Sequence, residues 1–434
     1  MTDVLVHAFD ALRRADAGAP AVLGPEREIS RDVLDAAARE AREAVDSASR
    51  SGAAVLQAPD GVPFLAGFLA LRRAGLAAIL ADARMPGAEV ARVADRLGAS
   101  AVLSWRGTWS WRACEGRPRA YPGIAALKLT SGSTGEPRGV EATAANLVAD
   151  EAQIASTMGI GAADRILGAI PMSHSYGLSS VAVPVLTRGC PAVLPDPGAG
   201  PWAALEAAER WRATVFPTVP AFLQALVRLE SPPPPPRSVR LVLTAGAPLD
   251  PATARRFRER FGLPVHVFYG SSETGGICYD RLGGAGERGT VGTPMDGVRV
   301  TLDPESGTVV VASAAVSGGV YRTRDAAERT ADGEWRLLGR DDVISVRGRK
   351  VHPREVEAVI AACDGVREVV VIGDGDVLRA VVACEPGAVD RETLLARCRE
   401  RLSPHKVPRS VVLVEELPRT ERGKLDRAAL SALA

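Results

Sequence analysis

The stretch that decides the fold is "AAVLQAPDGVPFLAGFLALRRAGLAAILADARMPGAEVARVADRLGASAVLSW", residues 53–105. Short apolar runs in it predict strands, and longer segments with apolar residues at helical spacing predict helices. In chain order, strand, helix, strand, helix and strand are expected at residues 53–59, 61–76, 77–82, 87–99 and 100–105. Strands that alternate with helices are typical of a parallel sheet covered on both faces. The stretch therefore predicts a doubly wound α/β sheet.

A second alternating run follows after residue 140. Helices are expected at 143–158, 175–188, 201–212, 219–229 and 250–261, and strands at 165–170, 191–194, 214–217, 239–244 and 264–268. "GTVGTPMDGVRVTLDPESGTVVVAS" (289–313) has the short alternating segments of a small antiparallel β subdomain. From residue 341 the pattern is strand, helix, hairpin and helix, typical of a small α+β domain. We thus expect an N-terminal α/β domain at 1–340 and a small mobile α+β C-terminal domain at 341–434.

Composition excludes several classes of protein. The 434 residues carry 53 Lys and Arg against 52 Asp and Glu, a net charge of +1, which argues against nucleic-acid and membrane-surface partners. No apolar run reaches the length of a membrane span. The six cysteines form no CxxC pair and no signal peptide is visible, so free thiols in a cytoplasmic protein are expected. The five histidines are dispersed without the spacing of metal ligands, which argues against a histidine metal site. No GxSxG motif is present, which argues against a Ser-His-Asp hydrolase.

"LKLTSGSTGEPRGV" (127–140) is rich in glycine and hydroxyl side chains. It follows the apolar run 124–130 and precedes the helix expected at 143–158. Strand, glycine-rich loop and helix is a setting in which backbone N–H groups and hydroxyls converge on phosphate. The spacing is not that of a Walker A loop. Taken alone, the segment is equally well explained as a plain turn.

The loop does not stand alone, because further motifs follow it in a fixed order. The six stretches are "TSGSTGEPRGV" (130–140), "LVLTAGAPLD" (241–250), "FYGSSETGG" (268–276), "YRTRDAAERTADGEWRLLGRDD" (321–342), "VRGRKVHPREVEAVI" (346–360) and "LPRTERGKLDR" (417–427). Together they resemble the adenylate-forming superfamily, which includes acyl-CoA synthetases, peptide-synthetase adenylation domains and firefly luciferase.

The resemblance implies that a carboxylate reacts with ATP to give an acyl-adenylate and pyrophosphate. An anionic carboxylate must attack an anionic phosphate, so cations and hydrogen-bond donors have to screen the two. The nucleotide-binding residues implied are Thr130, Ser131, Gly132, Ser133, Thr134, Gly135, Arg138, Gly139, Gly246, Ala247, Tyr269, Gly270, Ser271, Ser272, Asp325 and Arg340. Among them, Tyr269 would pack on adenine and Asp325 would accept hydrogen bonds from the ribose hydroxyls.

The catalytic residues implied are Lys424, Glu273, His174 and Thr130. Glu273 would bind Mg2+, which prefers oxygen ligands. Only four of the Lys and Arg residues are lysines, and a compact ammonium at position 424 suits a point charge that bridges the acid and the α-phosphate.

The acid pocket implied contains His174, Ser175, Tyr176, Gly275 and Gly276. No acidic side chain lies near residues 173–176, which disfavours an amino-acid substrate. The two glycines are expected to leave room for a ring or a chain.

The chain departs from the family pattern at several positions. Arg138 replaces a lysine and keeps its charge, Arg324 replaces a glycine near the ribose site, and Ser345 replaces a lysine. The spacing leaves Asp341 and Asp342 both open as the hinge about which the small domain would rotate.

Three functions remain open at this point. The resemblance favours transfer of the acyl group to coenzyme A. The first alternative is a stand-alone enzyme that loads an aryl or acyl acid onto the phosphopantetheine of an acyl or peptidyl carrier protein. The second is a nucleotide-binding protein that has lost catalysis.

Overall fold

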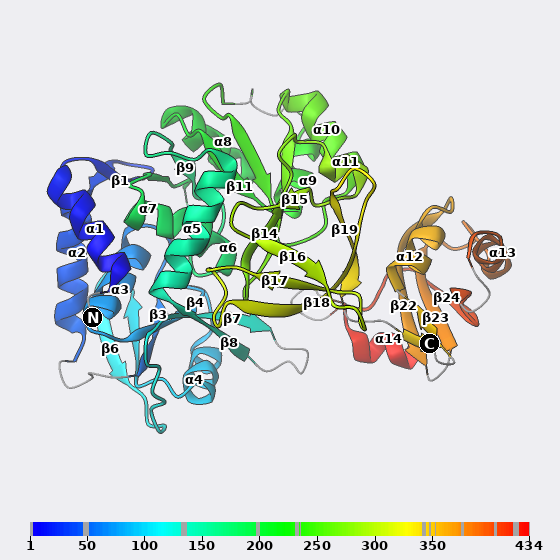
Figure 1. Ribbon diagram of the computed structural model, residues 1–434, viewed down its shortest axis with the longest axis horizontal. Coiled ribbons are helices and arrows are strands. Elements are labelled where there is room, and N and C mark those ends of the chain that lie inside the picture. Colours follow the sequence, from blue (N-terminus) through cyan, green and yellow to red (C-terminus); the bar gives the residue numbers. More distant parts are fainter. Residues whose placement is uncertain are drawn as a thin grey trace. The chain divides into compact units, whose positions relative to one another are not determined.

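The computed structural model describes residues 3–46, 52–131, 137–196, 200–230, 234, 236–340, 344–346, 349–351, 353–374, 377–402, 406–419 and 425–433. The chain divides into two compact units (Figure 1). The large unit comprises residues 1–301, 310–321 and 330–335, and the small unit comprises residues 302–309, 322–329 and 336–434. The α/β architecture is confirmed, whereas the domain boundary at 340/341 stays a prediction.

The first sheet of the large unit has six strands in the order β6-β5-β3-β4-β7-β8. Its strands are β3 (Ala53–Gln57), β4 (Ala77–Ala81), β5 (Ala101–Trp105), β6 (Trp109–Ala113), β7 (Ile124–Ser131) and β8 (Pro137–Thr143). The inner strands are parallel, while β6 and β8 run antiparallel at the edges. Around the sheet lie α1 (Val4–Ala15), α2 (Arg31–Ala44), α3 (Val62–Arg73) and α4 (Gly87–Arg96). The predicted strand and helix order of residues 53–105 is confirmed.

The second sheet of the large unit has nine strands in the order β15-β14-β13-β12-β11-β9-β10-β1-β2. Its strands are β1 (Pro20–Leu23), β2 (Glu28–Ser30), β9 (Ile166–Leu167), β10 (Ala192–Val193), β11 (Val215–Thr218), β12 (Leu241–Thr244), β13 (Val265–Ser271), β14 (Gly275–Tyr279) and β15 (Thr293–Pro294). Strands β13 to β1 in this order are parallel, and β14, β15 and β2 are antiparallel to their neighbours.

Helices fill the connections of the second sheet. They are α5 (Ala144–Met158), α6 (Ser175–Gly177), the π-helical segment η1 (Leu178–Ala182), α7 (Val183–Thr187), α8 (Gly200–Arg210), α9 (Pro220–Arg228), α10 (Pro251–Phe261) and α11 (Ala285–Arg288). Local signals explain where they begin and end. Asp250 caps α10 by accepting from Thr253 N–H at 2.9 Å, and Gly262 ends it with φ of 67°. Helix α5 contacts β7 and β8 of the first sheet and β14 of the second, so it lies between them.

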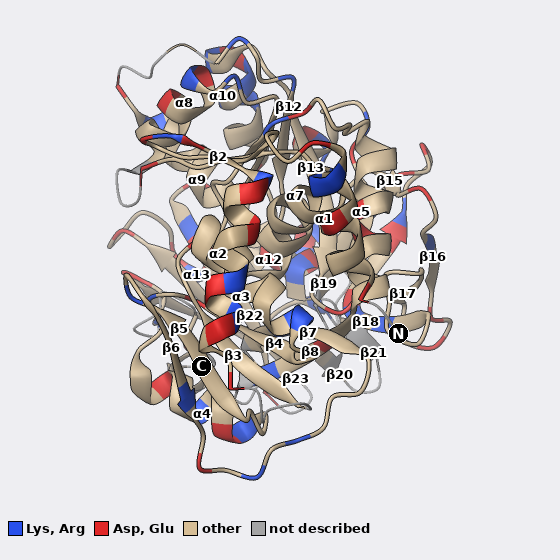
Figure 2. Ribbon diagram, turned by 90° about the vertical axis from the view of Figure 1, so that its left-hand side faces the viewer, with Lys and Arg blue, Asp and Glu red and all other residues tan. Residues whose placement is uncertain are grey.

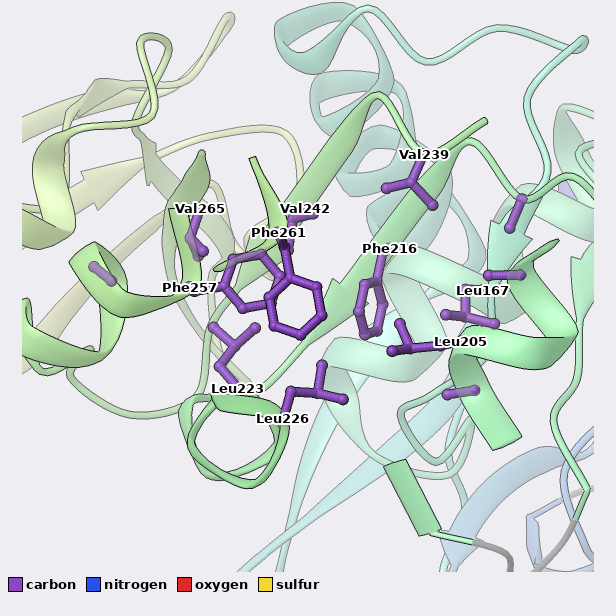
Figure 3. Close-up of a cluster of buried hydrophobic side chains, with 14 of the residues drawn as sticks. Leu167, Leu205, Phe216, Leu223, Leu226, Val239, Val242, Phe257, Phe261 and Val265 are labelled. Atoms are coloured by element: carbon purple, nitrogen blue, oxygen red, sulfur yellow. The ribbon is translucent and has the colours of Figure 1, made fainter. Parts of the chain in front are cut away.

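The core of the second sheet is built from aromatic and aliphatic side chains (Figure 3). Phe216 of β11 packs edge-on against Phe222 of α9, with ring centroids 5.7 Å apart. Phe257 and Phe261 of α10 stack at 4.6 Å. This face of the sheet is therefore closed by α8, α9 and α10.

The β region and the small unit complete the chain. Strands β16 (Arg299–Leu302), β17 (Thr308–Ala312), β18 (Val320–Arg329) and β19 (Trp335–Arg340) form a four-stranded sheet. The small unit also contains β20 (Ile344–Val346), β21 (Arg349–Val351), α12 (Pro353–Ala361), β22 (Val366–Asp374), β23 (Val377–Cys384), α13 (Arg391–Arg401), β24 (Ser410–Val414) and α14 (Arg427–Leu433). The predicted hairpin is β22–β23, and β24 joins it in parallel.

Charged residues of both signs are interspersed along the ribbon (Figure 2), in keeping with the net charge of +1. Within the part of the chain that the structure describes, each helix is too short or too polar to cross a membrane.

Some elements differ from expectation. Strands β9 and β10 are only two residues long, and β1, β2, β6, β8 and β14 had no predicted counterpart. Two residues are too few to show a repeat, and the pairing of the missed strands is decided by neighbouring strands rather than by local pattern.

Replacing Phe216 by Ala should lower the stability of the large unit by about 3–5 kcal/mol. The Phe216 side chain is enclosed by three helices, so its removal leaves a cavity. Thermal unfolding followed by near-UV circular dichroism would measure the loss. Leu282→Ala is the matched control, since that side chain is 84% exposed and its removal should change little. Equal shifts in both variants would contradict this description of the core.

Candidate functional site

The candidate phosphate loop lies at the end of an antiparallel hairpin. Strands β7 and β8 pair Thr130 with Arg138 and Leu129 with Gly139. Thr130 is half-buried and Arg138 is exposed. A side chain at Gly139 would come within 3.0–3.3 Å of Leu127 and Leu97, which explains the glycine by close packing. Residues Gly132, Ser133, Thr134 and Gly135 lie outside the described part, as does the side chain of Ser131.

The expected order of strand, loop and helix is wrong, because β8 intervenes between the loop and α5. The N-terminus of α5 is also closed by its own residues. Thr143 accepts from Asn146 N–H at 3.1 Å, and the Asn146 side chain accepts from Thr143 N–H at 3.1 Å. Such a capping box satisfies the amides that an anion would otherwise bind. If this segment binds phosphate, as predicted, the hairpin is the better source of contacts than the start of this helix.

A second group of candidates lies at the carboxyl ends of β12 and β13. These parallel strands are in register from Val242 with Val265 to Thr244 with Val267, so their ends meet at one edge. Gly246 and Ala247 follow β12 and are exposed, and Gly246 has φ of 87°. Tyr269 and Gly270 end β13 in the same region. Ligands of open α/β sheets bind at this edge. The assignment of these residues to adenine stays a prediction.

Glu273 is held on a closed turn between β13 and β14. The hydroxyls of Ser271 and Thr274 lie 3.0 Å apart, and Ser271 Oγ accepts from Thr274 N–H at 3.2 Å. Gly275 follows with φ of 68°, a conformation that favours glycine. Glu273 is half-buried, next to Ser272, at the tip of this turn. The turn thus presents one carboxylate at the carboxyl end of β13, the end of the sheet where Gly246 and Tyr269 also lie.

Three of the predicted acid-pocket residues, His174, Ser175 and Tyr176, lie at the start of α6. His174 is exposed and Ser175 is half-buried. The Tyr176 ring lies 5.6 Å from that of Phe268, and burial raises the pKa of its phenol, partly opposed by the backbone of Thr218. Tyr176 therefore packs beside β11, β12 and β13, close to the predicted adenine site.

The glycines of the predicted pocket do not provide the expected room. A Cβ on Gly275 would collide with the carboxylate of Asp150, and one on Gly276 would lie 2.5 Å from Met295 Sδ and 2.7 Å from the Phe268 ring. The expectation is wrong because protein atoms already occupy both directions. That these residues border the acid stays a prediction.

The remaining candidates belong to the small unit. Asp325 lies on β18, is buried, and its N–H donates to Thr323 Oγ1 at 3.1 Å. Arg340 ends β19, and its side chain is outside the described part. Asp341, Asp342 and Lys424 also lie outside the described residues. Their roles stay predictions.

Sequence reasoning missed two charged residues near the Glu273 turn, Lys128 and Asp150. Both are buried, at 4% and 3% exposure. Burial lowers the pKa of the Lys128 ammonium, and the carboxylates of Asp150 and Glu273 act in the opposite direction. The scarcity of lysine offered a signal for Lys128. No motif marked Asp150, because it reaches β14 from a distant part of the chain.

These features define a nucleotide-binding α/β enzyme with a glycine-rich hairpin and a carboxylate on a closed turn. Comparison with known proteins identifies the family. Residues 110–321 match the family described as AMP-binding enzyme, and residues 355–424 match the AMP-binding enzyme C-terminal domain.

Curated relatives are acid–CoA ligases. Feruloyl-CoA synthase of Amycolatopsis sp is 31% identical over 351 residues, covering 71% of this chain and 69% of the relative. The 2-succinylbenzoate–CoA ligase of Geobacillus kaustophilus is 31% identical over 343 residues, with 71% and 69% coverage. The sulfoacetate–CoA ligase of Cupriavidus necator is 29% identical over 349 residues, with 70% and 66% coverage. The matches span about two thirds of the length of these relatives.

Solved structures show the same fold. ATP-bound MatB from Rhodopseudomonas palustris superposes with a TM-score of 0.79 at 24% identity, covering 99% of this chain and 98% of that one. MenE, the o-succinylbenzoate CoA synthetase of Bacillus subtilis in complex with OSB-AMP, gives 0.81 at 24% identity, covering 97% of each chain. The chain belongs to the AMP-binding, adenylate-forming enzyme family, whose matched relatives are acyl- and aryl-CoA ligases.

Replacing Gly275 by Ala should destabilise the large unit and displace the Glu273 turn, because it combines an unfavourable φ with a collision against Asp150. Gly262→Ala is a matched control, with φ of 67° and open space around its Cβ. The control should cost about 1 kcal/mol from backbone strain alone, and Gly275→Ala clearly more. Thermal unfolding of both variants measures the difference, and similar losses would show that Asp150 does not pack against this turn.

Proposed function

We propose that this protein activates a carboxylic acid with ATP and transfers the acyl group to the thiol of coenzyme A. The observation that carries the proposal is the closed turn that presents Glu273 at the sheet edge shared by Gly246 and Tyr269. Membership of the AMP-binding family supports it, since the matched relatives are acid–CoA ligases. Their substrates include ferulate and 2-succinylbenzoate, so an aryl or acyl acid is proposed.

In the first half-reaction, a carboxylate oxygen forms a bond to the α-phosphorus of ATP, and the bond to pyrophosphate breaks. Thr130, Arg138 and the loop between them would hold the departing β- and γ-phosphates, while Tyr269 packs on adenine. Asp325 would fix the ribose. Lys424 would bridge the substrate carboxylate and the α-phosphate, where negative charge gathers in the transition state. The small domain would rotate at Asp341 or Asp342 to bring this lysine in.

In the second half-reaction, the thiol loses its proton to solvent, its sulfur bonds to the acyl carbon, and AMP leaves with the electrons of the carbon–oxygen bond. Lys424 would have no further task once the adenylate has formed. Rotation of the small domain would remove it and open a path for the thiol. His174 would form the gate before the acid pocket.

The donor set fits Mg2+ through Glu273. Among the residues with described positions, no group of three or more His, Cys, Asp or Glu could form a metal site. Mg2+ is usually held by one or two carboxylates together with substrate phosphates, and one half-buried carboxylate at the nucleotide edge satisfies that pattern. When bound, the ion would neutralise charge on the phosphate oxygens.

An amino-acid substrate is disfavoured on structural grounds as well. The acid nearest to Gly276 is Asp150, and its oxygens accept from Gly276 N–H at 2.9 Å and from Ser179 Oγ at 2.5 Å. A carboxylate engaged in this way is a poor partner for a substrate ammonium.

The six free cysteines support the proposed cytoplasmic location.

Purified protein should catalyse ATP–pyrophosphate exchange that depends on added acid, because adenylation is reversible while pyrophosphate is present. A panel of aryl and aliphatic acids would identify the substrate. With that acid, mass spectrometry of products formed with coenzyme A or a holo-carrier protein separates the main proposal from the carrier-loading alternative. Absence of exchange with every acid, together with ATP binding, would favour the nucleotide-binding protein without catalysis.

Lys424→Ala should reduce adenylation at least about a hundredfold while leaving ATP binding largely intact, because the lost ammonium acts on charge that develops in the transition state. Exchange rate and equilibrium dialysis of ATP measure the two properties. Lys406→Ala is the control: its ammonium pairs with Glu355 at 2.6 Å on the surface of the small unit and should leave both unchanged. Unaltered exchange in Lys424→Ala would refute the assigned role.

A further inference from the structure

A buried polar cluster joins the two sheets of the large unit next to the Glu273 turn. We call it the Asp150 junction: Lys128 of β7, Asp150 of α5, Ser179 of η1, and Gly275 and Gly276 of β14. The three side chains are 4%, 3% and 5% exposed. These elements come from both sheets and the helices between them, so the junction connects parts that lie far apart in the sequence.

Asp150 uses both carboxylate oxygens at this junction. Oδ2 accepts from Ser179 Oγ at 2.5 Å, and Oδ1 accepts from Gly276 N–H at 2.9 Å. The lack of a side chain at Gly275 lets the carboxylate approach the backbone of β14. A charged acceptor bound to a buried amide makes a strong hydrogen bond, so the start of β14 is tethered to α5.

The tether acts directly on the turn that carries Glu273. Gly276 pairs with Gly270, and Gly275 with Ser271, across the hairpin. Ser271 and Thr274 close the turn through their hydroxyls, and Thr274 is fully buried. Only the turn separates Glu273 from this fixed backbone. A shift of Gly276 would therefore move the Glu273 carboxylate.

Lys128 supplies the opposite charge. Its side chain is 4% exposed on β7, a strand that contacts α5, the helix of Asp150. The carboxylates of Asp150 and Glu273 both counteract the lowering of its pKa by burial. A buried ammonium near a buried carboxylate lowers the cost of keeping both groups charged. Lysine is also rare in this chain, so position 128 departs from its general use of arginine.

We propose that Asp150 and Lys128 are positioning residues for Glu273. Asp150 fixes the backbone that carries the turn, and Lys128 balances the charge of the two carboxylates. Neither residue takes part in bond making or breaking. This inference rests on the proposed function for the task of Glu273, whereas the tether itself is independent of it.

The neighbouring residue of α5 provides a matched control. Glu151 is also 3% exposed, and it binds Arg188 through two hydrogen bonds of 2.6 and 3.0 Å. This pair joins α5 to the end of α7 and has no bond to β14. Truncating Glu151 removes a buried carboxylate of the same helix without affecting the tether.

Hydrogen–deuterium exchange of the full-length protein tests the tether without any activity measurement. In Asp150→Ala, a peptide spanning residues 268–279 should exchange about tenfold faster, the size expected for loss of one buried charge-assisted hydrogen bond. Asp150→Asn keeps an acceptor for Gly276 N–H and should restore most of the protection. Glu151→Ala should lower the thermal midpoint but leave this peptide within about twofold of the wild type.

Exchange kinetics then test the link to Glu273. Asp150→Ala should raise the Mg2+ concentration for half-maximal ATP–pyrophosphate exchange several-fold, while Glu151→Ala leaves it unchanged. Lys128→Met should impair exchange, and the double variant Lys128→Met/Asp150→Asn should recover part of it, because the uncompensated carboxylate is removed.

The outcomes separate this inference from the proposed function. Unchanged protection of residues 268–279 in Asp150→Ala, or equal effects of Asp150→Ala and Glu151→Ala on protection and on Mg2+ dependence, would overturn the positioning role. A double variant no better than Lys128→Met would overturn the charge-balancing part. If the wild type itself shows no acid-dependent exchange, the proposed function fails, while the protection data still decide whether Asp150 holds the turn.

Discussion

The carboxylate of Asp150 is the constraint on which the candidate site depends. Asp150 lies on α5, the helix between the two sheets of the large unit, and accepts a hydrogen bond from Gly276 N–H of the second sheet. Its negative charge also raises the pKa of Lys128 on the first sheet, against the effect of burial. Another hydrogen bond also joins the two sheets, from Met172 N–H to Asp60 Oδ1 at 2.7 Å, but the bond from Gly276 N–H to Asp150 is made by the strand that directly follows Glu273. A charged hydrogen bond to that amide has a direction, whereas apolar packing is non-directional.

Burying these charges has a cost, which indicates what the arrangement is for. Removing an ammonium or a carboxylate from water costs several kcal/mol, and apolar residues of similar volume often give equal or better stability. The pair Glu151–Arg188 is joined by two hydrogen bonds and is explained by structure alone. Lys128 differs, because it is a buried ammonium on β7 whose pKa is lowered by burial and held up by the carboxylates of Asp150 and Glu273. Within our proposal, the demand of the site for charge balance explains this ammonium better than stability does.

The sequence predicts most of the fold but only part of the site. Residues 53–105 alternate cleanly because β3 and β4 are buried along their whole length, α3 is an apolar helix too long for a strand, and α4 buries one side only, so local pattern and final structure agree. Strand β8 was missed because its residues 137–143 show no apolar alternation, and its place is set by pairing with β7. Motifs single out Glu273 and Tyr269 as candidates, since each belongs to a short local segment. Asp150 could not be found in this way, because its partners Ser179 and Gly276 are brought to it only by the packing of α5.

The position of β8 also bears on how phosphate would be held in the proposed mechanism. A loop that leads straight into a helix offers the amides and the dipole of that helix to an anion. Here the amides at the start of α5 are already used by Thr143 and Asn146, and seven residues of β8, Pro137–Thr143, separate them from the loop. In the proposed mechanism, positive charge for the departing pyrophosphate would come from side chains, and the exposed cation on β8 is Arg138, which pairs with Thr130. Its guanidinium offers several donors in a plane, which suits phosphate oxygens. The replacement of lysine by arginine therefore keeps both the charge and the hydrogen bonds that a helix N-terminus does not supply here.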